Sequence, residues 1–421
     1  MQSAIEELEA KAKSAKAASR KLAHLPSEVK NKALMNIAEA LVKRQREILE
    51  YSEADCNEAR ASGIDDAMLD RLMLNSSRLQ AMAQDVRTVA SLPDPVGETF
   101  DTRVLPNGLR IERRRVPLGV IGAIYESRPN VTVDISSLCL KSGNAIILRG
   151  GKEAIHSNWI LVNVIKDALM GTGVPEDAIQ FIESTQRELV GQMLKMSENI
   201  DLIIPRGGEE LVKFVTENAT MPVLASGVGI CHTYVDPTAD LDKAMAIAYN
   251  AKVQRPTVCN ALDCLLVHSE IAERYLPLIA AEWAKAGVEM RCDERALKIL
   301  SSFNPVPASG SDWGKEFLAL IAAIKVVDSL DEALEHIARY SSGHSEAIIT
   351  EDYSAAMRFL QEVDAACVYV NASTRFTDGG QFGLGAEVGI STAKFHARGP
   401  MGLRELTTYK WVIMGSGQVR P

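Results

Sequence analysis

The sequence predicts an α/β protein with two lobes, each built around a parallel β-sheet. The chain has 421 residues, which is more than one hydrophobic core usually organises. From residue 119 to residue 371, short apolar runs alternate with segments of helical periodicity, the pattern of repeated strand–helix–strand units. The first hundred residues show helical periodicity alone. These three observations together indicate helices around two separate parallel sheets.

The N-terminal region is expected to be helical. Apolar residues recur at helical spacing between Val29 and Ile48, with Lys, Glu and Arg between them. A second amphipathic stretch covers residues 67–90 and ends near the Pro-rich segment 92–95. Residues 1–18 are charged and rich in Ala, without an apolar centre, so we expect no signal peptide.

An antiparallel hairpin is expected around Pro106-Asn107-Gly108. Strand-like sequence flanks these residues at 102–105 and at 109–112. Asn-Gly is a strong hairpin signal because both residues tolerate a positive φ. A plain surface hairpin and an assembly arm both remain open here, since a long hairpin leaves an unpaired edge that a partner can cover.

Buried strands and helices alternate in two series. The first series predicts strands at 119–125, 145–148, 179–182 and 202–204, with helices at 156–170 and 187–196. The second predicts strands at 262–267, 323–327, 347–350 and 367–371, with helices at 271–286, 330–340 and 353–362. We expect the chain to cross between the lobes near residues 226–240.

Net charge, apolar runs and cysteine content argue against several classes of protein. The net charge of −9 argues against a nucleic-acid groove and against a polybasic membrane anchor, because both need clustered Lys and Arg. The longest apolar run, Leu318–Val327, is interrupted by Lys325 and is far shorter than a membrane span. The seven cysteines are odd in number and form no CxxC pair, which is typical of thiols in a reducing compartment. We therefore expect a cytoplasmic protein that binds neither nucleic acid nor membrane.

Several common catalytic motifs are missing from the sequence. It contains no GxxxxGK[ST] phosphate loop, no HExxH, no GxSxG and no GxGxxG. The seven histidines are scattered, and no two of them share a metal-ligand spacing, so no metal site is predicted.

Cys259 is the strongest candidate for chemistry. It lies in the segment Asn250-Ala-Lys-Val-Gln-Arg-Pro-Thr-Val-Cys-Asn260, after a predicted helix and before a predicted strand. Thiolate is the reactive form of cysteine and nearby cations favour it, so Lys252 and Arg255 are candidate activators. On these residues alone, a small buried structural cysteine remains the commoner alternative.

Five motifs in a fixed order carry a resemblance to a known family. They are Gly119-Val-Ile-Gly-Ala-Ile-Tyr-Glu-Ser-Arg-Pro-Asn130, Lys141-Ser-Gly-Asn-Ala-Ile-Ile-Leu-Arg-Gly-Gly-Lys152, Ile204-Pro-Arg-Gly-Gly208, Gln254-Arg-Pro-Thr-Val-Cys-Asn-Ala261 and Phe382-Gly-Leu-Gly-Ala-Glu-Val-Gly-Ile-Ser391. Over nearly its whole length the chain resembles the gamma-glutamyl phosphate reductases, which are part of the aldehyde dehydrogenase superfamily. The resemblance implies an aldehyde dehydrogenase-like fold and makes Cys259 the nucleophile.

The resemblance also implies a reaction. The Cys259 thiolate would attack L-glutamyl 5-phosphate, release phosphate and form a thioester, which NADPH reduces to L-glutamate 5-semialdehyde in the second step of proline biosynthesis from glutamate. The oxyanion would be held by the Cys259 N–H and by a side chain that is either Ser127 or Asn130. Hydrolytic relatives carry a water-activating Glu before the nucleophile, whereas the corresponding segment Leu224–Gly229 contains no carboxylate.

Cofactor residues follow from the same resemblance. Arg149 and Lys152 stand where NAD-preferring relatives carry a Glu, and cations there favour the extra phosphate of NADP. Pro205, Gly207 and Gly208 open a predicted helix whose free N–H groups suit a pyrophosphate. Glu316 occupies the position of a carboxylate that holds the nicotinamide ribose, although the residues after it depart from the family pattern. A solvated charge pair remains the alternative for Arg149 and Lys152.

The substrate is anionic at both ends, so arginines are expected near Cys259. The candidate substrate-binding residues are Arg128, Arg255, Asn371, Ser373 and Arg375. Structural roles for these five remain equally open.

By resemblance, the chain divides into three parts. Residues 1–98 and 118–228 are expected to bind NADP, residues 229–395 to carry the catalytic cysteine, and residues 99–117 and 396–421 to form an oligomerisation arm. A homo-oligomer is therefore expected, and association with glutamate kinase, which would supply the labile acyl phosphate, is possible.

Three other functions stay open. An ordinary aldehyde dehydrogenase would oxidise a semialdehyde to an acid without needing phosphate. A cysteine hydrolase would need a His base near the thiol, and His268 is the nearest downstream candidate. A non-catalytic partner of glutamate kinase would not bind NADPH.

Overall fold

The computed structural model describes residues 2–225 and 227–420, and they form two compact units. The first unit contains residues 1–226, 383–389 and 401–421, and the second contains residues 227–382 and 390–400. The expected parts divided the chain differently, since they placed residues 383–389 with the catalytic cysteine and residues 396–400 in the arm. The expected N-terminal helix begins at Gln2, and Met1 and Ser226 lie outside the described residues.

Helices dominate the beginning of the first unit, as the periodicity predicted. They are α1 (Gln2–Leu22), α2 (Ser27–Lys43), α3 (Gln45–Ala61), α4 (Asp66–Leu72) and α5 (Ser76–Ser91). The side chains of Asp65 and Asn75 accept from backbone N–H groups in the first turns of α4 and α5, which fixes where these helices begin.

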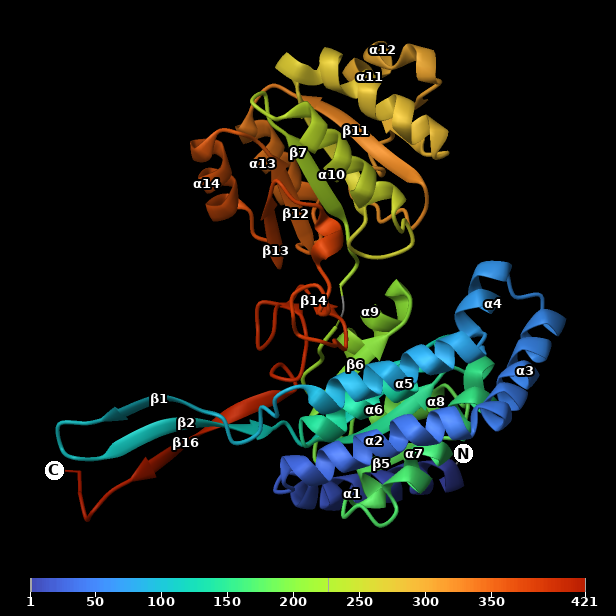
Figure 1. Ribbon diagram of the computed structural model, residues 1–421, viewed down its shortest axis with the longest axis vertical. Helices are drawn as coiled ribbons and strands as arrows, with labels where there is room; N and C mark the ends of the chain where they lie inside the picture. The colour runs from blue at the N-terminus through green and yellow to red at the C-terminus, as the bar shows by residue number, and fades with distance from the viewer. Residues whose placement is uncertain (1, 226, 421) are drawn as a thin grey trace. The chain divides into compact units, whose positions relative to one another are not determined.

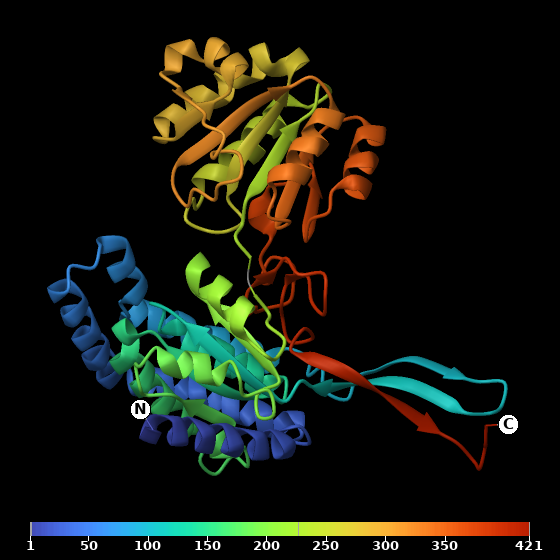
Figure 2. The ribbon, with the colours of Figure 1, turned by 180° about the vertical axis from the view of Figure 1, so that it is seen from behind.

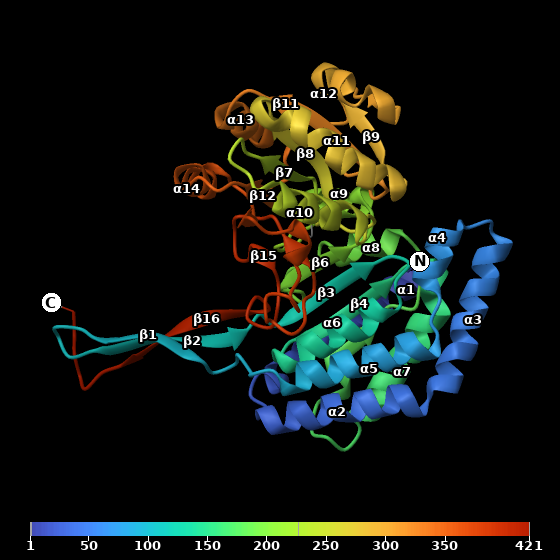
Figure 3. The ribbon, with the colours of Figure 1, turned by 45° about the horizontal axis from the view of Figure 1, so that its top comes forward.

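A four-stranded parallel sheet forms the centre of the first unit. Its order is β5-β4-β3-β6, from the strands β3 (Val120–Tyr125), β4 (Ala145–Gly150), β5 (Ile179–Phe181) and β6 (Leu202–Arg206). The connecting helices are α6 (Asn130–Lys141), α7 (Ile155–Leu169) and α8 (Glu188–Met193), with α9 (Glu209–Asn218) after β6. Short 3-10 helices occur at η1 (Lys152–Ala154) and η2 (Glu176–Ala178). Figure 3 shows α2, α5 and α6 lying along this sheet. All four strands were predicted.

The second unit contains a seven-stranded parallel sheet of order β10-β9-β11-β8-β7-β12-β13. The strands are β7 (Cys231–Val235), β8 (Leu262–His268), β9 (Glu289–Cys292), β10 (Val306–Pro307), β11 (Ile321–Val327), β12 (Ser345–Ile349) and β13 (Cys367–Val370). The helices are α10 (Leu241–Val253), α11 (Ser269–Lys285), α12 (Glu294–Ile299), α13 (Leu330–Tyr340) and α14 (Tyr353–Glu362), with 3-10 helices η3 (Ser301–Phe303) and η4 (Thr374–Phe376). The strands β14 (Ile390–Ser391) and β15 (Gly399–Pro400) form a separate pair.

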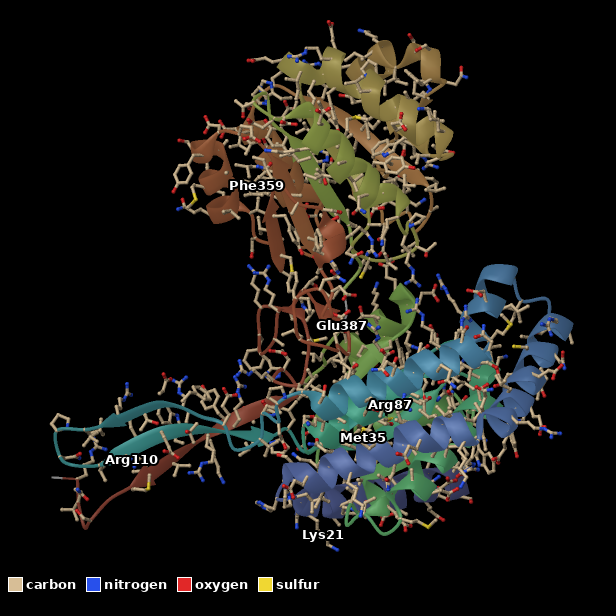
Figure 4. The ribbon with its side chains drawn as sticks, viewed as in Figure 1. Lys21, Met35, Arg87, Arg110, Phe359 and Glu387 are labelled. Atoms are coloured by element: carbon tan, nitrogen blue, oxygen red, sulfur yellow. The ribbon has the colours of Figure 1, made fainter. Side chains whose placement is uncertain are left out.

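Two apolar clusters show that this sheet is covered on both faces. One cluster joins Val235, Leu265 and Ile324 to residues of α10 and α11, and the other joins Tyr234, Leu266 and Ile348 to residues of α13 and α14 (Figure 1). Fully buried Phe359 belongs to the second cluster (Figure 4). The predicted doubly wound α/β fold is confirmed.

Three strands of this sheet, β7, β9 and β10, were missed by the sequence analysis. The region expected to cross between the lobes, residues 226–240, contains β7, which lies between β8 and β12. In its sequence Cys-His-Thr-Tyr-Val, the adjacent polar residues His232 and Thr233 leave neither a continuous apolar run nor a strict alternation.

The predicted hairpin is present, but its turn differs from the expected one. The strands β1 (Thr99–Val104) and β2 (Arg110–Pro117) pair with the C-terminal strand β16 (Thr407–Met414) in an antiparallel sheet (Figures 1 and 2). Gly108 donates to the Leu105 carbonyl at 2.8 Å and has φ 85°, whereas Asn107 is not among the residues with positive φ. Pro106 explains the difference, because its ring fixes φ near −65° and favours a type I turn followed by one left-handed residue.

No helix in the described ranges combines the length and the apolar character that a bilayer span requires.

Candidate active site

Cys259 differs from the other cysteines in its exposure. It is partly accessible, whereas the remaining six are buried. The loop that carries it follows α10 and enters β8, so Cys259 precedes the amino end of a central strand. A partly exposed thiol at the end of a rigid element suits a nucleophile better than a packing role.

The backbone before β7 packs tightly against this loop. A side chain at Gly229 would place its Cβ 1.7 Å from the Cys259 carbonyl oxygen, so only glycine fits there. The Cys231 thiol donates to the same carbonyl at 3.2 Å. These contacts fix the carbonyl side of Cys259 from a second strand.

Asn260 connects the Cys259 loop to η4. Its amide nitrogen donates to the Thr377 carbonyl at 2.9 Å, and its own carbonyl accepts from the Thr374 hydroxyl at 2.7 Å. The Arg375 guanidinium donates to the Asn260 side-chain oxygen and, at 2.8 Å, to Gln254. Arg375, a predicted substrate residue, is thereby held beside the Cys259 loop. Sequence analysis quoted Asn260 only as part of a motif, because its partners lie more than a hundred residues away.

Arg255 and Arg375 make the surroundings of Cys259 cationic. Arg255 is exposed and Arg375 is partly buried. Burial lowers the pKa of Arg375, and the nearby charge of Arg255 lowers it further. Both guanidiniums remain charged near neutral pH because an arginine pKa lies far above 7.

Lys252 does not fit its predicted role as an activator of the thiol. Its side chain is fully buried, and its amine donates to the Ala319 carbonyl at 3.2 Å and lies 3.6 Å from Asp263. Burial raises the pKa of Asp263 to about 7, although the Lys252 charge opposes that shift. Lys252 and Asp263 therefore form a buried pair within the structure. Arg255 and Arg375 are the cations that remain as candidates for favouring the Cys259 thiolate.

Glu316 lies close to the same loop. Its carboxylate accepts from the Gly229 N–H at 3.0 Å, and the next residue, Phe317, donates its backbone N–H to Asp263 at 3.1 Å. Glu316 is therefore tied to the glycine that packs on Cys259, despite the departure from the family pattern after it.

Asn371 and Ser373 have structural partners. The Asn371 amide accepts from the Thr350 N–H at 2.9 Å and donates to the Thr350 carbonyl at 2.8 Å. Its φ of 54° turns the chain after the carboxyl end of β13. Ser373 is buried and accepts from the Arg375 N–H at 3.3 Å, which caps η4. These contacts account for both side chains without a substrate.

The first unit contains the remaining candidates, gathered at the carboxyl edge of its sheet. The loops after β3, β4 and β6 carry Glu126–Asn130, Gly151–Glu153 and Gly207–Gly208, and these strands are direct neighbours. Ligands of open parallel sheets bind at this edge.

At this edge, the side chains of Ser127 and Asn130 differ in their partners. The Ser127 hydroxyl and backbone N–H both donate to Glu153, at 2.8 and 2.7 Å, and its φ is 48°. The Asn130 amide donates to Asp134 at 2.8 Å, one turn further along α6. Ser127 therefore closes a turn onto Glu153, a residue that sequence analysis did not single out. Arg128, between them, is exposed.

Arg149 and Lys152 also differ. The Arg149 guanidinium is buried and donates to the carbonyls of Gly150, Thr185 and Gln186, at 3.0, 3.1 and 3.5 Å. Burial lowers the pKa of Arg149. Lys152 is exposed at the start of η1. Of the two cations, Lys152 is the one that can meet a ligand phosphate, while Arg149 holds the 185–186 loop.

The backbone at the N-terminus of α9 already donates a hydrogen bond to a carboxylate. Glu126 takes a hydrogen bond from the Gly208 N–H at 3.0 Å, and a side chain on Gly207 would collide with the same carboxylate at 2.4 Å. Pro205 is buried within β6. The Gly208 N–H can bind an anionic group, and a pyrophosphate there would take the place of the Glu126 carboxylate.

Known proteins match this sequence and structure over their whole length. The aldehyde dehydrogenase family matches residues 1–297 and 303–412. The chain belongs to the aldehyde dehydrogenase family. Members of this family are oxidoreductases that use a nicotinamide cofactor, and the resemblance found in the motifs is confirmed.

Individual relatives are similar to this chain over nearly its whole length. Gamma-glutamyl phosphate reductase of Dehalococcoides mccartyi strain CBDB1 is 62% identical over 423 residues, covering 100% of both chains. The crystal structure of gamma-glutamyl phosphate reductase from Thermotoga maritima has a TM-score of 0.97 at 54% identity and covers 99% of this chain and 100% of its own. An acetylating aldehyde dehydrogenase from Geobacillus thermoglucosidasius, at 18% identity and a TM-score of 0.70, covers 100% of this chain and 99% of its own and shares the fold.

Proposed function

We propose that this protein reduces L-glutamyl 5-phosphate to L-glutamate 5-semialdehyde with NADPH and releases phosphate, as the second step of proline biosynthesis from glutamate. The observation that carries the proposal is the partly exposed Cys259, held between Gly229 and Asn260 in a chain whose full-length relatives bear the name gamma-glutamyl phosphate reductase. The location we propose is the cytoplasm, where the cysteines stay reduced.

The first half-reaction is nucleophilic. The Cys259 thiolate attacks the acyl carbon, the bond from that carbon to the phosphate oxygen breaks, and a thioester remains on sulfur. Arg255 and Arg375 favour the thiolate and the anionic leaving group, since both carry positive charge beside the loop. Gln254 and Asn260 orient the Arg375 guanidinium.

An oxyanion develops on the acyl oxygen in both half-reactions. We assign its donors as the backbone N–H of Cys259 and the side-chain amide of Asn130. Asn130 is preferred over Ser127 because the Ser127 hydroxyl hydrogen is directed to Glu153, whereas an amide nitrogen has a second hydrogen beyond the one given to Asp134.

The nicotinamide cofactor supplies the hydride that reduces the thioester. Gly207 and Gly208 would hold its pyrophosphate, since the Gly208 N–H already binds a carboxylate. Lys152 would meet the ribose phosphate of NADP, and Glu316 would hold the nicotinamide ribose. After reduction, the carbon–sulfur bond breaks, the aldehyde leaves and Cys259 is restored.

The segment before β7 has no side chain of its own that would activate water against the thioester. Among its described residues, Leu224, Ala225 and Gly227–Gly229 carry no ionisable side chain, and Ser226 lies outside the described part of the chain. A water-activating base there would hydrolyse the acyl-enzyme before reduction. The thioester should therefore pass to phosphate in the reverse reaction and only slowly to water.

The test supplies glutamate semialdehyde and NADP to the enzyme with and without inorganic phosphate. We expect sustained formation of NADPH and of the acyl phosphate only when phosphate is present. Rapid, sustained formation of glutamate without phosphate would show an ordinary aldehyde dehydrogenase and would end the proposal.

His268, the base that a cysteine hydrolase would need, lies at the other end of β8 from Cys259. His268 lies at the carboxyl end of β8 and accepts from the Glu270 N–H at 3.2 Å as the cap of α11. Cys259 precedes the amino end of the same strand, whose seven residues span about 20 Å. His268 is therefore in no position to deprotonate the thiol.

The proposal also includes assembly with other protein chains. The strands β1, β2 and β16 form an arm that pairs with another subunit in a homo-oligomer, and glutamate kinase is a further candidate partner. An arm with two unpaired edge strands supports the first of these. Failure to bind NADPH would instead favour a non-catalytic partner of the kinase.

A further inference from the structure

Three potential metal ligands meet inside the second unit, and none of them belongs to the Cys259 loop. They are His232 on β7, Cys264 on β8 and His336 on α13, and their ligand atoms all lie within 4.8 Å of one another. The three residues are 0%, 1% and 5% exposed. Two histidines and a cysteine enclosed together are unusual in an apolar core, where such groups need partners.

The sheet topology creates this cluster. His232 and Cys264 are directly opposite each other on neighbouring parallel strands, so their side chains leave the same face of the sheet. The helix α13 covers that face, since its Ala333 and Ile337 pack in one apolar cluster with Cys264. His336 lies one residue before Ile337 on α13, and its ring lies close to the side chains of His232 and Cys264.

A carboxylate fixes the tautomer of His232. Glu346, the partner of His232 on β12, lies 3.1 Å from the His232 Nδ1 and accepts from the His232 backbone N–H at 2.8 Å. Its other oxygen accepts from the Ser341 hydroxyl. Nδ1 faces this carboxylate, so in the neutral form of the imidazole the hydrogen lies on Nδ1 and the lone pair on Nε2. A carboxylate behind a histidine in this way is the usual support of a metal-binding imidazole.

The His232 Nε2 has no hydrogen-bond partner within the described part of the chain, and the side chain is fully buried. An unpaired acceptor in the core destabilises the fold. A bond from Nε2 to a metal ion would use that lone pair.

We propose that His232, Cys264 and His336 form a structural binding site for Zn²⁺. Two imidazole nitrogens and one thiolate match the ligand preference of zinc. Tetrahedral zinc holds nitrogen and sulfur ligands about 3.5 Å apart, given bond lengths of roughly 2.0–2.3 Å. The Cys264 Sγ lies 3.7 Å from the His336 Nε2, close to that spacing. On binding, the Zn–S bond replaces the S–H bond, and the proton leaves to solvent.

The site is structural because it is closed. The rings of Trp313 and Tyr340 pack on His336 at centroid distances of 5.5 and 4.7 Å. Three protein ligands leave the fourth tetrahedral position to a water molecule, and the enclosing rings keep a substrate from reaching it. Bound zinc would instead link β7, β8 and α13, and the inference is independent of the reaction at Cys259.

The first experiment measures zinc in the full-length protein after growth in zinc-supplemented medium and dialysis against a weak chelator. We expect about one zinc per chain, and a loss of at least tenfold in Cys264→Ala. Cys292→Ala is the matched control, since Cys292 is equally buried in the other apolar cluster of the same unit. Cys259→Ala tests whether zinc sits instead on the partly exposed thiol, and it should keep its metal.

A second measurement uses wild-type protein alone, in case the core variants fail to fold. The metal is removed by unfolding with a strong chelator, and the chain is refolded with Co²⁺. Tetrahedral cobalt bound to one thiolate gives a sulfur-to-metal charge-transfer band and intense visible absorption, and we expect both. We also expect the refolded protein without metal to melt at a lower temperature than the zinc form.

Several outcomes would overturn the proposal. These are less than a tenth of a zinc per wild-type chain with no cobalt band, zinc that persists in Cys264→Ala, and zinc that disappears in Cys259→Ala.

Discussion

Individual side chains around Cys259 are held by partners from other elements. Arg375 is fixed by Gln254 and Asn260, and the Cys259 carbonyl is fixed by Cys231. A preorganised cation beside a thiol lowers the free energy of the thiolate without any rearrangement during the reaction. The residue-scale predictions therefore concern the thiol itself and the cation proposed for the cofactor.

Cys259→Ser should remove reductase activity, by about 10³-fold or more, because a serine hydroxyl beside these arginines remains protonated. NADPH binding, followed by fluorescence titration, should stay nearly unchanged. Cys139→Ser, in the buried core of the first unit, is the control and should keep its activity. The assignment fails if native alkylation labels another cysteine and that modification alone abolishes activity.

Lys152→Glu should shift preference from NADPH toward NADH. The substitution replaces an exposed cation with a carboxylate that repels the ribose phosphate and accepts from ribose hydroxyls. Loss of one charged hydrogen bond is worth about 1–3 kcal/mol, or roughly 5- to 150-fold in the ratio of kcat/KM values for the two cofactors. Lys32→Glu, exposed on α2, should leave that ratio unchanged. An equal ratio in wild type and Lys152→Glu would place Lys152 outside the cofactor site.

At the scale of elements, glycine sets how closely two loops approach. The loop before β7 can lie on the Cys259 carbonyl only because Gly229 has no side chain. The same glycine donates its N–H to Glu316, so three separate segments meet at one residue. A small displacement there should misalign the nucleophile.

Gly229→Ala should lower kcat by about 100-fold, the effect expected of a displacement near 1 Å in a reacting group. The added Cβ would meet a backbone atom, which no rotamer change can relieve. Gly310→Ala is a matched control in the same unit, since its Cβ would meet no atom within 4 Å. Steady-state rates and the rate of Cys259 alkylation would both be measured. Normal rates in Gly229→Ala would show that the close approach does not position Cys259.

At the scale of the whole molecule, the arm contains apolar surface that one chain leaves exposed. The strands β1 and β16 are the two edges of its sheet, and Arg110, labelled in Figure 4, lies on β2 between them. Val104 is 70% exposed and Ile413 is 57% exposed. Unpaired edges with exposed apolar residues favour pairing with another chain.

The full-length protein should therefore be at least a dimer at micromolar concentration, as measured by light scattering. Ile413→Lys should raise the dissociation constant at least tenfold, because it buries a charge at the proposed contact. Tyr353→Lys, at a position 78% exposed on α14, is the control and should leave the assembly unchanged. A monomeric wild-type protein would refute the arm's role.

The sequence by itself determined most of the elements and singled out Cys259 as the candidate nucleophile. Both are encoded in contiguous residues: the apolar runs gave β3, β4, β6 and β8, and the motif around Cys259 identified one thiol among seven. Hydrophobic periodicity needs no knowledge of distant partners, so these four strands lie where the sequence placed them. The strand β7 was missed because its residues carry no such periodicity.

Only the tertiary structure decided what each side chain touches. Arg149 faces carbonyls 36 residues away, Asn371 binds Thr350, and Lys252 pairs with Asp263. The spacing of His232, Cys264 and His336 along the sequence matches no metal-ligand motif. Strand register and helix packing bring these three residues together. Partners of this kind depend on which strands are neighbours, and that order is a property of the whole fold rather than of any local segment.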